Sequence, residues 1–350
     1  MAPVLSPVLE QCLEDLESRL DESREEANRQ AWVDFLEGRT PGDIFTPPPR
    51  RANPAGVAWP GVHINDALAD PEAMVLRELA ACSAMLDGGA MRLNVRCNYG
   101  SGILPTLFGC ELFIMERAMD TLPAARPLGS AEAVRRVVAA GVPDLDAGLG
   151  RRVFQTAQLV LEVFRRYTKI GRHVVLYHPD IQGPIDVAEV VWGSDIFYAF
   201  YEERSLLRDF LAVITETYAA FMRRWYELVP PPPDGYATHW GLLHKGRLML
   251  RNDSLMNLSP AAYVEFVRPH DQRLFDEFGG GAMHFCGRGD HYIGEMVTMR
   301  GLTAIQLSQP RLNDMDTIYR HTVDRGLVLL NFSREAALRA GRPLRGLVQC

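Results

Sequence analysis

Residues 279–290 read Gly279-Gly280-Gly281-Ala282-Met283-His284-Phe285-Cys286-Gly287-Arg288-Gly289-Asp290. The glycines predict a turn on each side of a short strand. Side chains alternate between the two faces of a strand, so His284 and Cys286 are expected on one face and Met283 and Phe285 on the other. An imidazole and a thiolate side by side suit a borderline-soft cation such as Zn²⁺, which needs at least one further protein ligand. A buried cysteine beside a hydrogen-bonded histidine in a core strand is the alternative interpretation.

Strand-like and helix-like segments alternate on both sides of this stretch. Strand patterns occur at 91–98, 173–184, 238–241, 248–254, 302–308, 326–332 and 344–350. Helical patterns occur at 70–87, 131–140, 150–170, 187–200, 205–228, 290–299, 313–325 and 333–340. This alternation predicts an α/β fold with a parallel sheet and helical crossovers.

Polar residues gather where the predicted strands end. They are Asn98, Asp180, Asp253, Cys286, Gln309 and Cys350. A closed eight-stranded barrel would collect these ends around one mouth, whereas an open doubly wound sheet would spread them along a crevice. No dinucleotide-binding fingerprint opens the first crossover, which favours the barrel. We therefore expect a single TIM-type (β/α)8 barrel over residues 61–350, with an N-terminal extension over residues 1–60.

The N-terminal extension combines a helix with a proline-rich arm. Leu9, Leu13, Leu16 and Leu20 recur at helical spacing within a helix expected over residues 6–38. Six prolines between residues 41 and 60 predict an extended arm with little regular structure. The leucine seam must be covered, either by the body of the same chain or by a second subunit in a homodimer.

Composition narrows the classes of function. A net charge of -7 argues against nucleic-acid binding, which needs a basic face to displace counterions from phosphates. The N-terminal segment lacks the pattern of a signal peptide, and no window has the ~18 uninterrupted apolar residues of a membrane span. The six cysteines show no disulfide-framework spacing. We expect a cytoplasmic protein with reduced thiols and no contact with a membrane.

Three runs of sequence, taken together, resemble the uroporphyrinogen decarboxylase superfamily. In chain order they are Pro179-Asp180-Ile181-Gln182-Gly183-Pro184; then Asn252-Asp253-Ser254 with Leu258-Ser259-Pro260-Ala261-Ala262-Tyr263 and Phe266-Val267-Arg268-Pro269; then His284-Phe285-Cys286-Gly287. The resemblance covers roughly residues 90 to 350. It implies a TIM-type barrel and one of two chemistries: metal-free decarboxylation of a porphyrinogen, or zinc-dependent methyl transfer between a corrinoid and a thiol.

The methyltransferase branch is the better match. The decarboxylase branch carries an N-terminal Met-Arg-Gln-Ala-Gly-Arg signature that is missing here, and Arg50 and Arg51 lie in proline-rich sequence without that pattern. The methyltransferase branch resembles this chain in having His-x-Cys on one strand and a further Cys on the last strand. By this resemblance His284, Cys286 and Cys350 would bind zinc, and a methyl group would pass between a methylcobamide and a thiol acceptor. A separate corrinoid-carrying protein would supply the cobamide.

Other polar residues are assigned with less specific arguments. Asp180 and Asp253 are candidate catalytic groups at the mouth, although capping of turns or helices would equally account for them. Asn98, Gln182 and Gln309 are candidate cofactor-binding residues. His291 is a candidate substitute metal ligand, although a surface or supporting position suits it better.

Two alternative functions stay open. A decarboxylase-like enzyme would place Asp180 near pyrrole N–H groups and Arg96 or Arg251 near carboxylates. A non-catalytic barrel would bind a tetrapyrrole or another small ligand.

Overall fold

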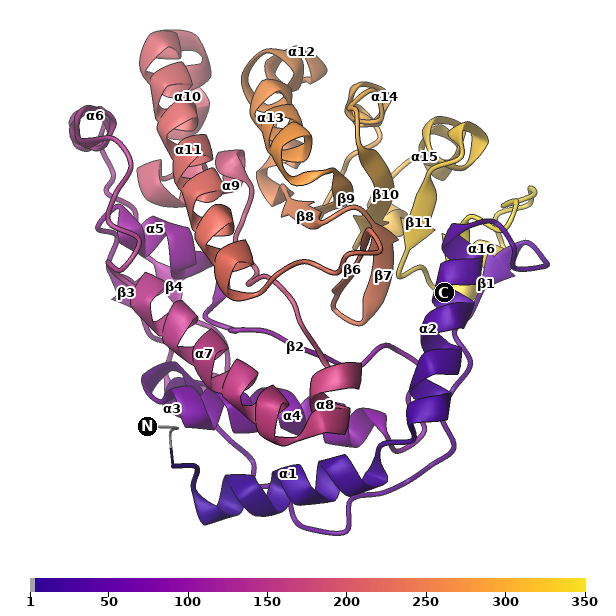
Figure 1. The fold of residues 1–350 in the computed structure, drawn as a ribbon. Helices are drawn as coiled ribbons and strands as arrows, with labels where there is room; N and C mark the ends of the chain where they lie inside the picture. The colour runs from indigo at the N-terminus through magenta and orange to yellow at the C-terminus, as the bar shows by residue number, and fades with distance from the viewer. Residues whose placement is uncertain (1–3) are drawn as a thin grey trace.

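Six parallel strands form the central sheet, in the order β1-β12-β11-β10-β9-β8 (Figure 1). Their bounds are Ile44–Phe45 (β1), Leu248–Arg251 (β8), Gly281–Phe285 (β9), Leu302–Leu307 (β10), Val328–Leu330 (β11) and Val348–Gln349 (β12). The structure is a computed structural model and describes residues 4–350. The first three residues of the segment used above to argue against a signal peptide lie outside the described residues.

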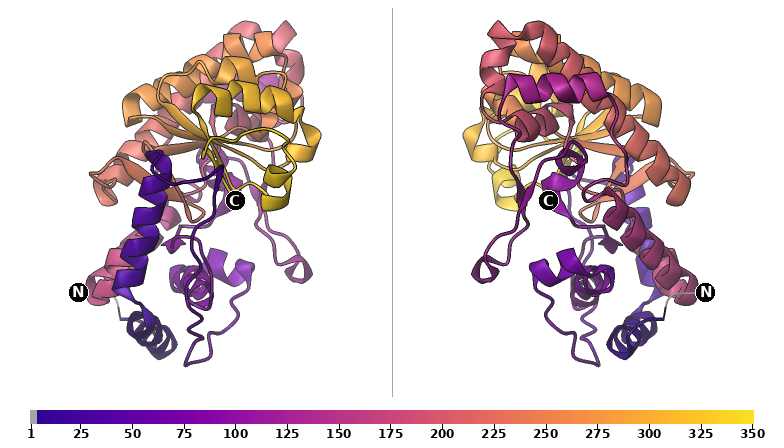
Figure 2. Two further views of the ribbon diagram at one scale, coloured as in Figure 1. Left: turned by 90° about the vertical axis from the view of Figure 1, so that its right-hand side faces the viewer. Right: turned by 90° about the vertical axis from the view of Figure 1, so that its left-hand side faces the viewer.

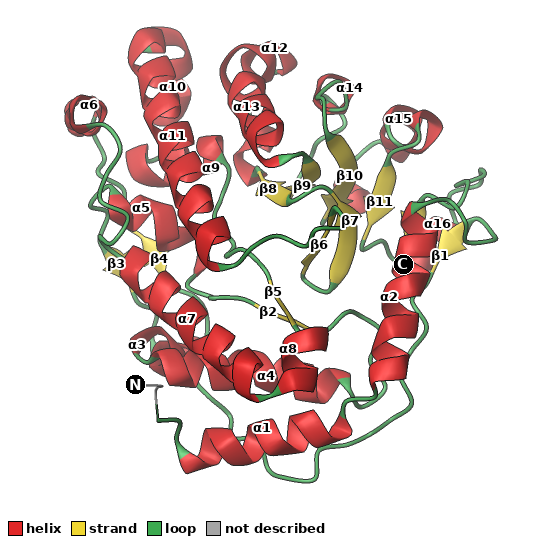
Figure 3. Ribbon diagram, in the orientation of Figure 1, coloured by secondary structure: helices red, strands yellow, loops and turns green. Residues whose placement is uncertain are grey.

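Each face of the sheet buries its own core. On the outer face, Met283 and Phe285 of β9 pack into the larger cluster together with the helical layer. This layer is visible in Figure 3 and includes α11 (Arg204–Leu228), α13 (Arg268–Phe278), α14 (Ile293–Met296) and α15 (Met315–His321). The short helix α16 (Arg334–Leu338) contributes Ala337 to the same cluster. On the inner face, Ala282 packs with Trp32 and Phe35 of α2 (Glu22–Leu36). Because both faces are covered, the strands are apolar almost throughout, as is usual for parallel sheets.

The remaining strands pair separately. The pair β2 (Asn94–Val95) and β5 (Val175–Leu176) is parallel. The pairs β3 (Leu112–Phe113) with β4 (Ala124–Ala125), and β6 (Tyr236–His239) with β7 (Leu242–Lys245), are antiparallel.

The continuous eight-stranded barrel expected from the sequence is therefore not seen among residues 4–350; the fold shown is mixed α/β with a six-stranded parallel sheet. A side chain stands in for ladder bonds between β5 and β8, since the backbone N–H of Met249 donates to His178 Nε2 at 3.3 Å. β2 and β5 have only two residues each, too few to extend the ladder further.

The predicted N-terminal helix is two helices, α1 (Pro7–Arg19) and α2. The break occurs because the Asp21 side chain accepts from the N–H of Arg24 at 3.2 Å and caps a new helix. The leucine seam is fully buried within the chain's own core, where α1 packs beside α4 (Pro71–Met85) and α8 (Thr168–His173). Figure 2 shows these N-terminal helices on the opposite side of the strands from the C-terminal helical layer.

The proline-rich arm contributes more structure than predicted. Its residues Ile44 and Phe45 form β1, which pairs in parallel with β12. Further along, Arg50 makes a two-pronged ion pair with Glu25 of α2 at 2.6 and 2.7 Å, and both side chains are 3% exposed. The arm is thus fastened to both the sheet and α2.

The other helices complete the chain. They are α3 (Ile64–Ala69), α5 (Ile103–Leu107), α6 (Ala131–Ala140), α7 (Gly150–Arg166), α9 (Pro184–Trp192), α10 (Ile196–Glu202) and α12 (Pro260–Ala262). Within residues 4–350, none of the helices combines the length and the apolar character needed to cross a membrane.

Candidate metal centre

Strand register builds a polar layer at the carboxyl ends of three neighbouring strands. Arg251 of β8 and Gln306 of β10 are the register partners of His284 on β9. One layer deeper, the same inner face carries the apolar residues Met249, Ala282 and Ala304. The alternation of side chains therefore places a polar rim over an apolar floor.

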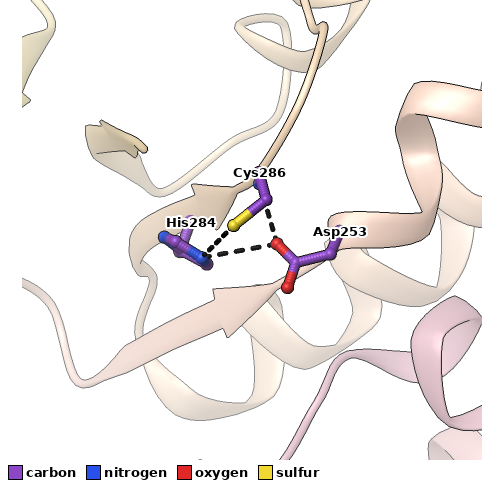
Figure 4. A group of neighbouring side chains, drawn as sticks. All are labelled: Asp253, His284 and Cys286. Carbon is purple, nitrogen blue, oxygen red and sulfur yellow. Dashed lines mark hydrogen bonds and ion pairs between the residues drawn. The ribbon is translucent and has the colours of Figure 1, made fainter. Parts of the chain in front are cut away.

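Three potential metal ligands converge at this rim. One ligand atom from each of Asp253, His284 and Cys286 lies within 4.8 Å of the others (Figure 4). His284 Nε2 is 3.3 Å from Asp253 Oδ1 and 3.5 Å from Cys286 Sγ. The backbone N–H of Cys286 also donates to Asp253 Oδ1 at 2.7 Å, which ties the carboxylate to the strand end.

A hydrogen bond orients the His284 ring. Nδ1 faces Gln306 Oε1, and because this oxygen can only accept, Nδ1 carries a proton. The lone pair of neutral His284 is then on Nε2, the atom that faces Asp253 and Cys286. Supporting contacts of this kind are typical of metal-binding histidines.

The ligand atoms also interact electrostatically. Burial lowers the pKa of His284, but hydrogen bonds to Asp253 and Cys286 outweigh it and raise that pKa to about 9. Burial raises the pKa of Asp253, yet the His284 contact leaves it below its usual value. Without a metal, the site is therefore held together by an imidazolium–carboxylate pair.

The donor set fits a zinc ion. Nitrogen, sulfur and carboxylate oxygen are all established zinc ligands, and three protein ligands leave a fourth tetrahedral position open for a substrate or water. A thiolate and a carboxylate would also balance the two positive charges of the ion.

A second polar cluster, of Arg96, Asp180 and Arg251, adjoins the centre. Asp180 is ion-paired with Arg96 and with Arg251, the latter at 2.6 Å. The Trp240 indole N–H donates to Asp180 at 3.0 Å. The Trp240 ring also contacts the Arg251 guanidinium and the His284 ring, and the Trp240 and His284 ring centroids are 5.0 Å apart. Asp180 is therefore beside the cluster of three ligands and is already engaged by cations.

Trp240 was not identified from the sequence. It occupies the turn between β6 and β7 with a φ of 51°, followed by Gly241 at 76°. Such turns favour Asn-Gly, and a left-handed non-glycine residue costs about 1–2 kcal/mol. Strained backbone positions of this kind tend to lie at functional sites. A tryptophan directly before the glycine of this turn was therefore the feature of the sequence that could have identified Trp240.

The candidate cofactor-binding residues are dispersed. Gln309 Oε1 accepts from the N–H of Gly287, so Gln309 holds the loop that follows Cys286. Asn98 donates to half-buried Glu78 at 3.1 Å. Gln182 Oε1 is buried without a hydrogen-bond partner among residues 4–350. Their role toward a cofactor stays a prediction, and the contact of His291 Nε2 with Leu258 O at 2.9 Å places that histidine in a supporting position.

Cys350 is not in the cluster of three ligands. It follows β12, and its N–H donates to Phe45 O at 2.8 Å. Strands β10 and β11 lie between β9 and β12, so three strand spacings of ~4.8 Å separate them along the sheet. Asp253, predicted as a catalytic group, occupies the third position beside His284 and Cys286 instead.

Comparisons with known proteins support the fold. No family model and no curated protein matches the chain. Among solved structures, a methyltransferase from Methanosarcina mazei superposes with a TM-score of 0.59, covering 91% of this chain and 90% of the other at 16% identity. The chain thus shares its fold with a methyltransferase over most of both lengths.

Proposed function

We propose that this protein is a zinc-dependent methyltransferase that moves a methyl group between a methylated corrinoid and a thiol acceptor. The observation that carries the proposal is the convergence of Asp253, His284 and Cys286 at the strand ends of a fold shared with a methyltransferase. The corrinoid would arrive on a separate carrier protein. Zinc held by these side chains would lower the pKa of a bound thiol and so favour its nucleophilic thiolate form.

The chain's own residues would prepare the site for this chemistry. Gln306 holds the His284 ring with Nε2 toward the other two ligands. The N–H of Cys286 fixes the Asp253 carboxylate. Trp240 packs against His284, with ring centroids 5.0 Å apart, and would help to hold the imidazole in this orientation.

The test is methyl transfer from free methylcobalamin to a small thiol, followed by the absorbance change as the corrinoid is demethylated. Zinc-loaded wild-type protein should accelerate the reaction, and Cys286→Ser should reduce it to the background rate. Cys110→Ser is the matched control, because Cys110 is a buried thiol outside the cluster. Equal rates in Cys286→Ser and wild type would refute the proposal.

A decarboxylase-like function is the second candidate, favoured by the pair Arg96 and Arg251. Two guanidiniums share one carboxylate, so the cluster carries an excess positive charge that could bind a substrate carboxylate. Asp180 is less suited to the pyrrole contact that this function needs, since its oxygens are already bonded. Metal-free decarboxylation of uroporphyrinogen by the purified protein would support this candidate.

A further inference from the structure

A carboxylate that is not itself a ligand lies directly behind the candidate metal centre. Asp186, in the first turn of α9, is only 4% exposed. One of its oxygens accepts from the backbone N–H of Asp253 at 2.7 Å, and the other accepts from the N–H of Ser254 at 2.8 Å. Burying a carboxyl group without hydrogen-bond partners is costly, and these two hydrogen bonds satisfy both of its oxygens there.

A glycine allows α9 to approach the end of β8 this closely. The N–H of Gly183 donates to Arg251 O at 2.7 Å. A Cβ at this position would overlap Asn252 Oδ1 and come within 2.8 Å of Arg251 O, although the Gly183 φ of -64° is ordinary. The close packing, and not the backbone conformation, therefore requires glycine.

Asp253 depends on this support because its own side chain is not enclosed. The Asp253 side chain is 44% exposed, at the first residue of the short 3-10 helix Asp253–Asn257. Its Oδ1 nevertheless meets both the N–H of Cys286 and Nε2 of His284. The backbone that carries this side chain is held by the two Asp186 hydrogen bonds and, one residue earlier, by the N–H of Asn252 donating to His284 O at 3.0 Å.

We infer that Asp186 is a positioning residue that sets where Asp253 presents its carboxylate to the metal. This inference rests on the proposed metal centre. Asp271 provides the contrast, since it is equally buried in the same region but accepts from the side chain of Asn252 at 2.8 Å. Asp271 therefore has no direct hold on Asp253.

Cobalt(II) is the probe for the test, because its absorption bands report ligand geometry as well as affinity. In Asp186→Asn, the amide N–H₂ group would replace one carboxylate oxygen and face a backbone N–H, so that one of the two hydrogen bonds is lost. Cobalt should then bind 10 to 100-fold more weakly, which is the range for loss of a supporting contact. Its bands should also shift, whereas Asp271→Asn should change both properties little. Asp186→Ser, which can accept only one of the two N–H groups, gives a second variant if Asp186→Asn does not fold.

A double-mutant cycle separates positioning from general loss of structure. Once Asp253→Ala has removed the carboxylate, adding Asp186→Asn should weaken cobalt binding no further. A further tenfold loss in that background would overturn the inference. Wild-type affinity in Asp186→Asn would also overturn it, while leaving the metal centre in place.

A measurement that needs no metal tests the role of Asp186 even if the proposed metal centre is wrong. If cobalt binding by wild type does not depend on Cys286, the proposed centre is wrong. The crystal structure of metal-free Asp186→Asn then decides the positioning role. Asp253 Oδ1, now 2.7 Å from the N–H of Cys286, should lie outside hydrogen-bond distance. An unchanged distance would refute the role of Asp186.

Discussion

His284 and Cys286 show what the alternation of a single strand can predict. Their expected projection to one face is confirmed by the 3.5 Å between Nε2 and Sγ. The sequence also predicted that Asp253 lies at the same mouth, because it follows a strand. It did not predict that Asp253 contacts His284 and Cys286. Gln306, which orients His284 from the next strand, follows only from the register of β9 and β10.

A histidine cluster beneath Trp240 predicts how stability depends on pH. His178, His239 and His244 lie in contact and are buried. Burial lowers the pKa of His178 to about 3 and that of His244 to about 4, and it also lowers the pKa of His239. In the unfolded chain these groups titrate near ~6.5. At a pH between the folded and the unfolded pKa values, the unfolded state binds more protons than the folded state. The stability that depends on the neutral, buried cluster is therefore fully present above pH ~6.5 and is lost as the pH falls toward 4.

Denaturant unfolding of metal-free protein from pH 7 to 4 measures this effect. Each histidine should contribute up to about 1.4 kcal/mol per pH unit to the fall in the free energy of unfolding. His244→Gln should reduce the pH dependence of the free energy of unfolding by the contribution of one histidine. His63→Gln, which changes a histidine near the surface and outside the cluster, should not reduce it. Equal slopes for His244→Gln and wild type would show that the cluster does not control acid stability.

At the scale of elements, α1 is part of the chain's own core. Leu16 is fully buried, whereas Val8 on the same helix is 50% exposed. Leu16→Ala should therefore lower the free energy of unfolding by about 2–5 kcal/mol, while Val8→Ala should change it little. Denaturant unfolding and mass in solution are the measurements. A change in oligomeric mass with unchanged stability would mean that the seam contacts another subunit.

The helices and strands were predicted correctly where the local sequence determines them, and less well where contacts between distant segments decide. Periodicity within a segment identified most helices and the strands from β8 onward, because it depends on local sequence. It did not reveal the break between α1 and α2, which depends on one capping side chain, Asp21. Nor could it show that the backbone N–H of Met249 in β8 bonds to the side chain of His178 and not to a neighbouring strand.

For the whole molecule, the N-terminal 60 residues are expected to be indispensable. They supply β1, and they place Trp32, Phe35 and Phe45 against the inner face of the sheet. A chain consisting of residues 61–350 should expose this face and fail to unfold cooperatively, as followed by circular dichroism and calorimetry. A cooperative transition near that of the full chain would instead support an independent domain beginning at residue 61.

The third member of the cluster, Asp253, shows why the whole candidate site could not be predicted from the sequence. Sequence order placed both Asp253 and Cys350 at strand ends, but only the strand order β8-β9-β10-β11-β12 distinguishes a neighbour from a distant strand. Asp253 follows β8, next to β9, and Cys350 follows β12. Such distances depend on pairing between segments far apart in the chain.

Metal content tests the central claim that Asp253, His284 and Cys286 form one zinc site. Elemental analysis of purified protein should give about one zinc per chain in wild type and little in Cys286→Ser, while both remain folded. Cys350→Ser should retain its zinc if Asp253 is the third ligand, and lose it if the prediction from sequence is right. Zinc-free wild-type protein, or full zinc occupancy in Cys286→Ser, would contradict the claim.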